Sequence, residues 1–76
     1  MEARFLTLTD VAETLNITLA QAKSLVRSQD LAAIKVGGRG VWRVERSELE
    51  AYIQRMYDDT RAFIARGEGQ ESGPQI

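Results

Sequence analysis

The chain contains neither cysteine nor histidine among its 76 residues. Without cysteine, disulfide bonds, thiol nucleophiles and cysteine-based metal sites are excluded. Without histidine, the usual general base and the commonest neutral metal ligand are also missing. The remaining Asp, Glu, Lys and Tyr side chains form no cluster that suggests catalysis. We therefore expect a protein that is not an enzyme, with no cofactor, metal or small-molecule substrate.

Long apolar runs are missing as well. No segment approaches the roughly 20 apolar residues of a membrane helix, and the first four residues lack the basic start and apolar stretch of a signal peptide. We therefore expect a cytoplasmic protein that does not bind membranes. A chain of 76 residues forms at most one domain with much of its surface exposed, so we expect it to act through that surface.

Positive charge is concentrated in the middle of the chain, although the net charge is −1. Residues 18–46 contain six Lys or Arg and two acidic residues, whereas acidic residues are in excess on both sides. A basic zone of this kind is typical of a surface that binds nucleic acid. The alternative is a solvated surface with uneven charge.

Two short helices are expected, over residues 8–15 and 19–28, where apolar residues recur at helical spacing. Asn16 suits the left-handed conformation that ends helices, and the connection of about three residues is the turn length of a helix-turn-helix. Each helix begins with the spacing of a capping box, Thr7 with Asp10 and Thr18 with Gln21.

The outer face of the second helix is a candidate binding surface. If Ala22, Leu25 and Val26 point inward, polar side chains remain outside. Gln21 suits adenine and Ser24 suits several bases, whereas basic side chains suit phosphates. An ordinary solvated helix carries the same residue types, and Gln21 also has a capping role. The candidates for DNA contact on this helix are Thr18, Leu19, Gln21, Lys23, Ser24 and Arg27.

Residues 31–44 show the alternation of β-strands. If Val36 faces Trp42, the connection is the three-residue loop Gly38-Arg39-Gly40, in which Gly40 is left-handed. This register places four apolar side chains on one face, so we interpret Trp42 as a core residue rather than one that stacks on bases. The four are Ile34, Val36, Trp42 and Val44.

The same register places Lys35 and Arg43 opposite each other on the outer face. Like charges in this position repel, and a phosphate between them would convert the repulsion into attraction. Arg39 lies at the loop tip between two glycines, a form suited to a narrow, electronegative minor groove. The alternative for Arg39 is a solvent-exposed turn residue.

A long amphipathic helix is expected up to Arg66, after a third capping box formed by Ser47 and Glu50. Gly67 ends this helix, and the Gly-rich polar segment 67–76 is expected to be disordered. The expected domain therefore covers residues 1–66.

Several short segments follow one another in a characteristic order. They are Leu6-Thr7, Val11-Ala12, Leu15-Asn16-Ile17-Thr18, Leu25-Val26-Arg27-Ser28, Lys35-Val36-Gly37-Gly38-Arg39, Trp42-Arg43-Val44 and Ser47-Glu48-Leu49. In this order they resemble the excisionase-type, MerR-like winged helix-turn-helix family over residues 5–54.

The resemblance implies a mainly α fold with a small β-hairpin, followed by a long C-terminal helix. It also implies a recognition helix in the major groove of double-stranded DNA and a wing on the backbone or minor groove. Matched onto this chain, the base-contacting positions are Leu19, Gln21, Lys23 and Ser24, and the wing positions are Arg39 and Arg43.

The C-terminal helix extends beyond what so small a domain needs to cover. MerR regulators dimerise through an antiparallel coiled coil after the DNA-binding part, so the resemblance implies a homodimer. The residues that would form it are Met56, Tyr57, Phe63 and Ile64. The alternative is a helix that folds back along its own domain.

The basic zone and the resemblance together predict a DNA-binding transcriptional regulator. One alternative is an excisionase-like architectural factor that bends DNA for a recombinase, which fits Leu19 and Ser24 at positions where many relatives carry arginine. The other is a protein-interaction adaptor or antitoxin that uses Tyr57, Phe63 and Ile64 and does not bind DNA.

Overall fold

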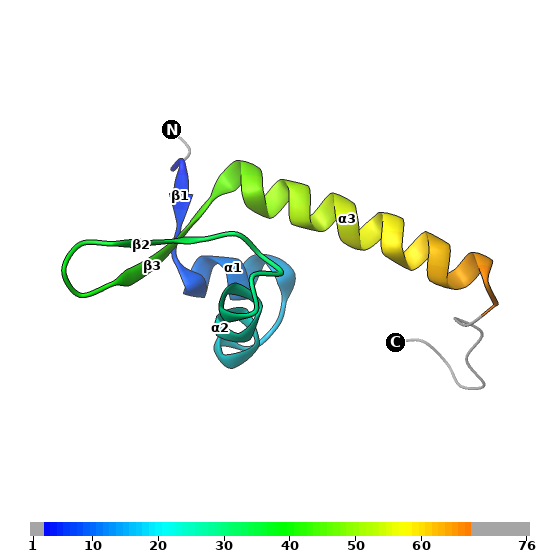
Figure 1. Ribbon diagram of the computed structural model, residues 1–76, viewed down its shortest axis with the longest axis horizontal. Coiled ribbons are helices and arrows are strands. Elements are labelled where there is room, and N and C mark those ends of the chain that lie inside the picture. Colours follow the sequence, from blue (N-terminus) through cyan, green and yellow to red (C-terminus); the bar gives the residue numbers. More distant parts are fainter. Residues whose placement is uncertain (1–2, 68–76) are drawn as a thin grey trace.

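The computed structural model describes residues 3–67, which form three helices and a three-stranded antiparallel sheet in which β3 lies between β1 and β2. The hairpin β2–β3 extends to one side of the α1–α2 pair and α3 runs away on the other (Figure 1). This architecture confirms the predicted mainly α, winged helix-turn-helix fold. The elements are β1 (Phe5–Leu6), α1 (Leu8–Leu15), α2 (Leu19–Arg27), β2 (Ile34–Val36), β3 (Val41–Glu45) and α3 (Arg46–Ala65).

The capping box predicted for α1 is present. Thr7 Oγ1 accepts a hydrogen bond from the Asp10 N–H at 2.9 Å, and Asp10 Oδ2 accepts one from the Thr7 N–H at 3.1 Å. Asn16 ends the helix in the left-handed conformation, with φ 58° and ψ 48°. Its N–H then donates to carbonyls of the last turn. The predicted bounds of α1 are confirmed.

The core lies between α1, α2 and the inner face of the sheet. Its largest fully buried side chains are Val11, Leu31 and Val44. The sequence analysis missed Leu31, which belongs to neither a helix nor a strand. Gln29 adopts a positive φ of 67° after α2, and the Leu31 N–H then donates to the Leu25 carbonyl at 3.1 Å. The reversed chain therefore returns Leu31 to the core.

Helix α3 begins at Arg46 without the capping box predicted at Ser47. Strand β3 runs directly into α3, so Ser47 is already helical and Glu45 takes the N-cap position without a side-chain hydrogen bond. The Arg46 N–H instead donates to the Arg4 carbonyl at 2.8 Å, next to the β1–β3 pairing. A backbone partner from the start of the chain therefore replaces the side-chain cap.

The far end of α3 agrees with the prediction. The helix ends at Ala65, and Gly67 follows with φ 81°. Apart from Gly67, the segment 67–76 that was expected to be disordered lies outside the described residues.

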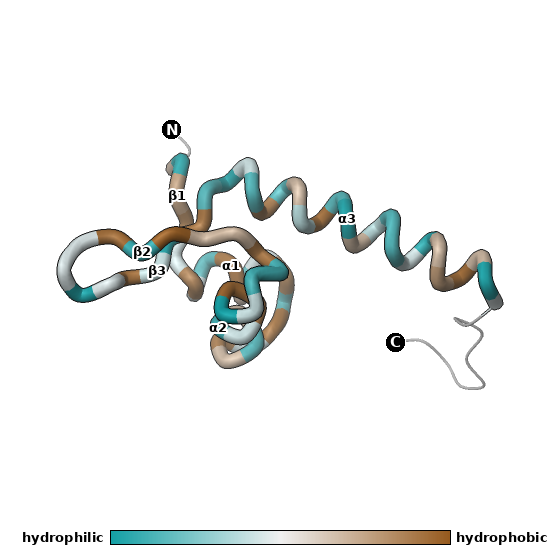
Figure 2. The backbone as a smooth tube through the Cα atoms, in the orientation of Figure 1, coloured by the Kyte–Doolittle hydropathy of each residue, from teal (hydrophilic) through white to brown (hydrophobic). Residues whose placement is uncertain are grey.

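Only the first half of α3 packs on the domain. Leu49 is buried and Tyr52 half-buried, whereas Tyr57 is 63% exposed and Ile64 58%. Arg55 Nη2 donates to the Asp30 carbonyl at 2.9 Å and ties the helix to the α2–β2 connection. Beyond this point apolar residues recur along a helix that no other described element covers (Figure 2).

We predict that Leu31→Ala lowers the free energy of unfolding by about 2–5 kcal/mol, because it removes a fully buried side chain and leaves a cavity. The matched control is Leu19→Ala at a position that is 45% exposed, where we expect a change below about 0.5 kcal/mol. Urea unfolding followed by circular dichroism measures both. Equal effects of the two substitutions would contradict the core position of Leu31.

Candidate nucleic-acid interface

A second capping box fixes the N-terminus of α2. Thr18 Oγ1 accepts from the Gln21 N–H at 3.1 Å, and Gln21 Oε1 accepts from the Thr18 N–H at 2.9 Å. The same Oε1 lies 3.3 Å from Thr18 Oγ1. A bidentate contact with adenine needs both the oxygen and the nitrogen of the amide. Gln21 can make that contact only if its cap opens.

The outer side of α2 is exposed along its whole length, because Ala22 and Val26 point into the core. Gln21 and Ser24 border a groove on the side of α3, whereas Arg27 borders a hollow on the side of the hairpin. The sequence-predicted residues that the structure leaves exposed here are Thr18, Leu19, Gln21, Lys23, Ser24 and Arg27.

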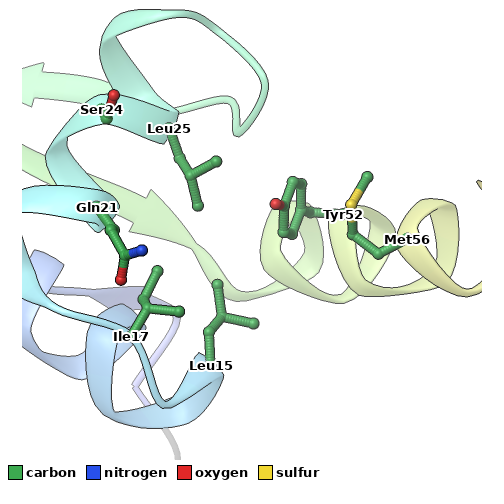
Figure 3. Close-up of a pocket in the computed structure, with 7 residues that line it drawn as sticks. All are labelled: Leu15, Ile17, Gln21, Ser24, Leu25, Tyr52 and Met56. Atoms are coloured by element: carbon green, nitrogen blue, oxygen red, sulfur yellow. The ribbon is translucent and has the colours of Figure 1, made fainter. Parts of the chain in front are cut away.

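The groove between α2 and α3 has a volume of about 460 Å³ and is mainly apolar. Figure 3 shows Leu25 on the α2 side and Tyr52 on the α3 side, with Leu15 and Ile17 below them and Met56 further along α3. Within the described part of the chain no charged side chain lines it. This groove therefore suits an apolar partner rather than a phosphate.

The register of the hairpin differs from the predicted one by one residue. Val36 pairs with Val41, Lys35 with Trp42 and Ile34 with Arg43. The connecting turn has four residues, Gly37–Gly40, and the Gly40 N–H donates to the Gly37 carbonyl at 3.1 Å. The predicted three-residue loop is wrong because Gly37, like Gly40, adopts a positive φ, and the two together close a longer turn.

This register separates Lys35 from Arg43. Residues directly opposite each other share a face of the sheet, and successive residues alternate between faces. Lys35 therefore lies with Trp42 on one face, and Arg43 lies with Ile34 on the other. The predicted phosphate site between Lys35 and Arg43 is wrong, and Arg43 Nη1 instead donates to the Trp42 carbonyl at 2.7 Å.

The apolar residues of β2 change sides for the same reason. Ile34 and Val36, predicted to face the core, are 49% and 48% exposed. Trp42 is half-buried and packs against the core, as predicted, but on the same face as Val44 and Lys35. The alternation of residues along a strand shows which of its side chains share a face. It does not show which face of β2 lies on the same side of the sheet as which face of β3, so the sequence alone did not reveal this arrangement.

Two predicted cationic residues border the same hollow at the inner face of the hairpin. Arg27 and Lys35 line a hollow of about 520 Å³ between α2 and the strands, together with Trp42. Lys23 lies one turn before Arg27, and Arg39 is exposed in the Gly37–Gly40 turn. Within residues 3–67 none of these four cations forms an ion pair.

Among residues 3–67 no three acidic side chains are grouped so that they would hold a metal ion. No helix in the described part combines the length and the hydropathy needed to cross a bilayer.

A family model described as a helix-turn-helix domain matches residues 5–57, from β1 to the middle of α3. The match covers more than half of the chain, which therefore belongs to the helix-turn-helix domain family. Membership implies a DNA-binding domain of a type that is usually not catalytic. No curated protein and no solved structure matches the chain. The narrower resemblance to excisionases and MerR regulators stays a prediction.

We predict that Thr18→Ala lowers the free energy of unfolding by about 1 kcal/mol, because it removes the hydroxyl that caps α2. Thr18→Ser keeps the hydroxyl and should retain most of the stability. Denaturant unfolding of the three proteins measures the difference. An equal loss in both variants would show that the hydroxyl does not stabilise the helix.

Proposed function

We propose that the protein is a transcriptional regulator that places α2 in the major groove and its wing, the β2–β3 hairpin, on the backbone or in the minor groove. One observation supports this proposal most: Lys23, Arg27, Lys35 and Arg39 are exposed and, among the described residues, have no ion-pair partner. Neighbouring cations repel each other, whereas contact with duplex phosphates releases counterions and turns the same charges into a source of affinity.

In this proposal α2 both positions the protein and contacts bases. Ser24 is exposed in the middle of the helix, where its hydroxyl can bond to several bases, and Leu19 near the N-terminus can contact a thymine methyl group. Lys23 and Arg27 contact phosphates, which fix the position of the helix without selecting a sequence. Arg43 adds positive charge from the outer face of the wing.

A second candidate function is the architectural one, in which the protein bends DNA for a recombinase. It is favoured by the small number of base-selective groups on α2, where the Gln21 carbonyl oxygen is already bonded to Thr18. Gel mobility with the binding site moved along a fragment distinguishes the two roles. If the mobility of the protein–DNA complex depends on the position of the binding site, the DNA is bent and the architectural role is supported. Constant mobility supports the regulator.

We predict that Arg39→Ala weakens binding to a mixed-sequence duplex about tenfold and lowers the slope of log K against log salt by about 1, because one phosphate contact is lost. Fluorescence anisotropy across a salt series measures both quantities. The control is Arg61→Ala on α3, which removes an exposed arginine that pairs with Asp58 at 3.4 Å.

The same titration tests the proposal itself. Wild-type affinity that does not respond to salt would contradict a phosphate-dominated interface. Wild-type affinity that falls with salt, with no effect of Arg39→Ala, would remove the wing tip from the interface and leave DNA binding intact.

We also propose that α3 pairs with α3 of a second copy to form a homodimer. Its apolar stripe, half-buried at Tyr52 and Ile53 and exposed further along, is symmetric about the level of Asp58. The residues of each of the three pairs are equally far from Asp58: Tyr52 and Ile64, Ile53 and Phe63, and Met56 and Thr60. A two-fold axis brings such positions of two antiparallel helices opposite each other. The same stripe therefore serves as both halves of one interface, with Tyr57 at its edge.

The groove between α2 and α3 supports this arrangement. Tyr52 and Met56 line that groove and also an adjoining apolar hollow that reaches Thr60. In the antiparallel pair, Ile64 of the second copy lies level with Tyr52, which borders the groove. Phe63 of the second copy lies level with Ile53, which borders the adjoining hollow. A dimer also supplies two recognition helices, which fits binding to two half-sites.

We predict that Phe63→Glu converts the dimer into a monomer, because it places a charge in the apolar stripe. Ala62→Glu introduces the same charge on the opposite side of α3 and should leave the dimer intact. Sedimentation equilibrium measures the two association constants.

A wild-type protein that stays monomeric at high concentration would contradict the homodimer. If it also failed to bind duplex DNA but formed a salt-resistant complex with another protein, the adaptor or antitoxin hypothesis would replace the regulator.

A further inference from the structure

The hollow between α2 and the wing has the charge of an anion site. It is lined by two cationic side chains, Arg27 from α2 and Lys35 from β2, and by no acidic side chain of the described residues. Gln29 adds a polar amide at its edge, while Trp42 and small apolar side chains form its wall. Both cations are exposed and neither forms an ion pair within residues 3–67.

The Lys35 side chain is held in place by its neighbours. Its Nζ lies 5.0 Å from the centre of the Trp42 ring, within the range of a cation–π interaction. A Cβ at Gly40 would lie only 3.1 Å from Lys35 Cδ. Because glycine has no Cβ, the aliphatic part of the Lys35 side chain can pass over this position. Gly40 also has a φ of 64°, a backbone conformation that residues with a side chain rarely adopt. Gly40, Lys35 and Trp42 therefore form a stack, in which the ammonium group lies over the Trp42 ring and beside Gly40.

We propose that this hollow binds one phosphate of the DNA backbone, with Arg27 and Lys35 on the same phosphate group. The guanidinium donates to one non-bridging oxygen and the ammonium to the other, since both cations are donors without competing carboxylates. One phosphate held by a residue of α2 and a residue of β2 fixes the wing relative to the recognition helix. Lys35 is a direct ligand in this site, and Trp42 and Gly40 are positioning residues.

This inference rests on the proposed function and adds to it, because it states that two cations share one phosphate rather than each contacting its own. The two arrangements differ measurably. Each neutralised phosphate contributes about 0.9 to the salt slope for duplex DNA. Removal of both cations should therefore lower the slope by about 0.9 if they share a phosphate and by about 1.8 if they do not.

The experiment is a double-mutant cycle on the full chain with a mixed-sequence duplex. The variants are Arg27→Met, Lys35→Met and the double variant, with Arg61→Met as the control for a cation outside the site. Shared contact predicts a combined loss of affinity at least fivefold smaller than the product of the two single losses. Thermal unfolding of each variant verifies that it is folded.

Three further measurements test the stack. Trp42 is the single tryptophan of the chain, so its fluorescence reports on the hollow and should change when duplex binds, but not when inorganic phosphate is added at the same ionic strength. Lys35→Arg keeps the charge and should retain the salt slope. Gly40→Ala also keeps all charges and should weaken binding while leaving the slope near that of the wild type.

The outcomes separate this inference from the proposed function. Duplex binding with independent effects of Arg27→Met and Lys35→Met, or with unchanged Trp42 fluorescence, would overturn the shared phosphate and leave DNA binding standing. A response of Trp42 to inorganic phosphate equal to that with duplex would overturn the assignment to the DNA backbone. Failure of the wild type to bind any duplex would overturn both.

Discussion

The pairing of Val36 with Val41 across the Gly37–Gly40 turn determines the face on which each hairpin side chain lies. Side chains alternate along a strand, so a shift of one residue would transfer the side chains of β2 to the opposite face while those of β3 stay where they are. In the observed register Trp42 packs against the core and Lys35 lies beside α2. The position of Lys35 beside α2 therefore depends on a turn closed by two left-handed glycines.

The net charge of the whole chain, −1, is a poor guide to how its surface interacts with DNA. Several acidic side chains are engaged away from the hollow, such as Asp10 in the cap of α1 and Glu45 with Arg4 at 2.7 Å. Exposed charges are screened over about 8 Å at physiological salt. A local group of cations such as Arg27 and Lys35 can therefore attract phosphate despite the acidic residues on α3.

Helix α3 connects the stability of the domain with its proposed assembly. Leu49 completes the core and Arg55 bonds to the Asp30 carbonyl, but the second half of the helix has no support from its own domain. Water-exposed apolar side chains along that half are costly, and a second copy would remove part of the cost. A small domain gains stability from such pairing, and a dimer would hold two α2 helices in a fixed relation.

The sequence by itself determined the bounds of α1, the start of α2 and the exposed face of α2, because caps and helical periodicity act over three or four residues. Asn16 and the two capping boxes were sufficient for this. Only the tertiary structure decided the hairpin register, the burial of Leu31 and the start of α3. Both registers keep Trp42 and Val44 on the core face, so the sequence pattern does not select one of them. The observed pairing differs in β2, where it places Lys35 opposite Trp42 and leaves Ile34 on the other face. The Arg46 N–H likewise donates to the Arg4 carbonyl, just before β1 near the start of the chain, and no local sequence pattern predicts so distant a partner.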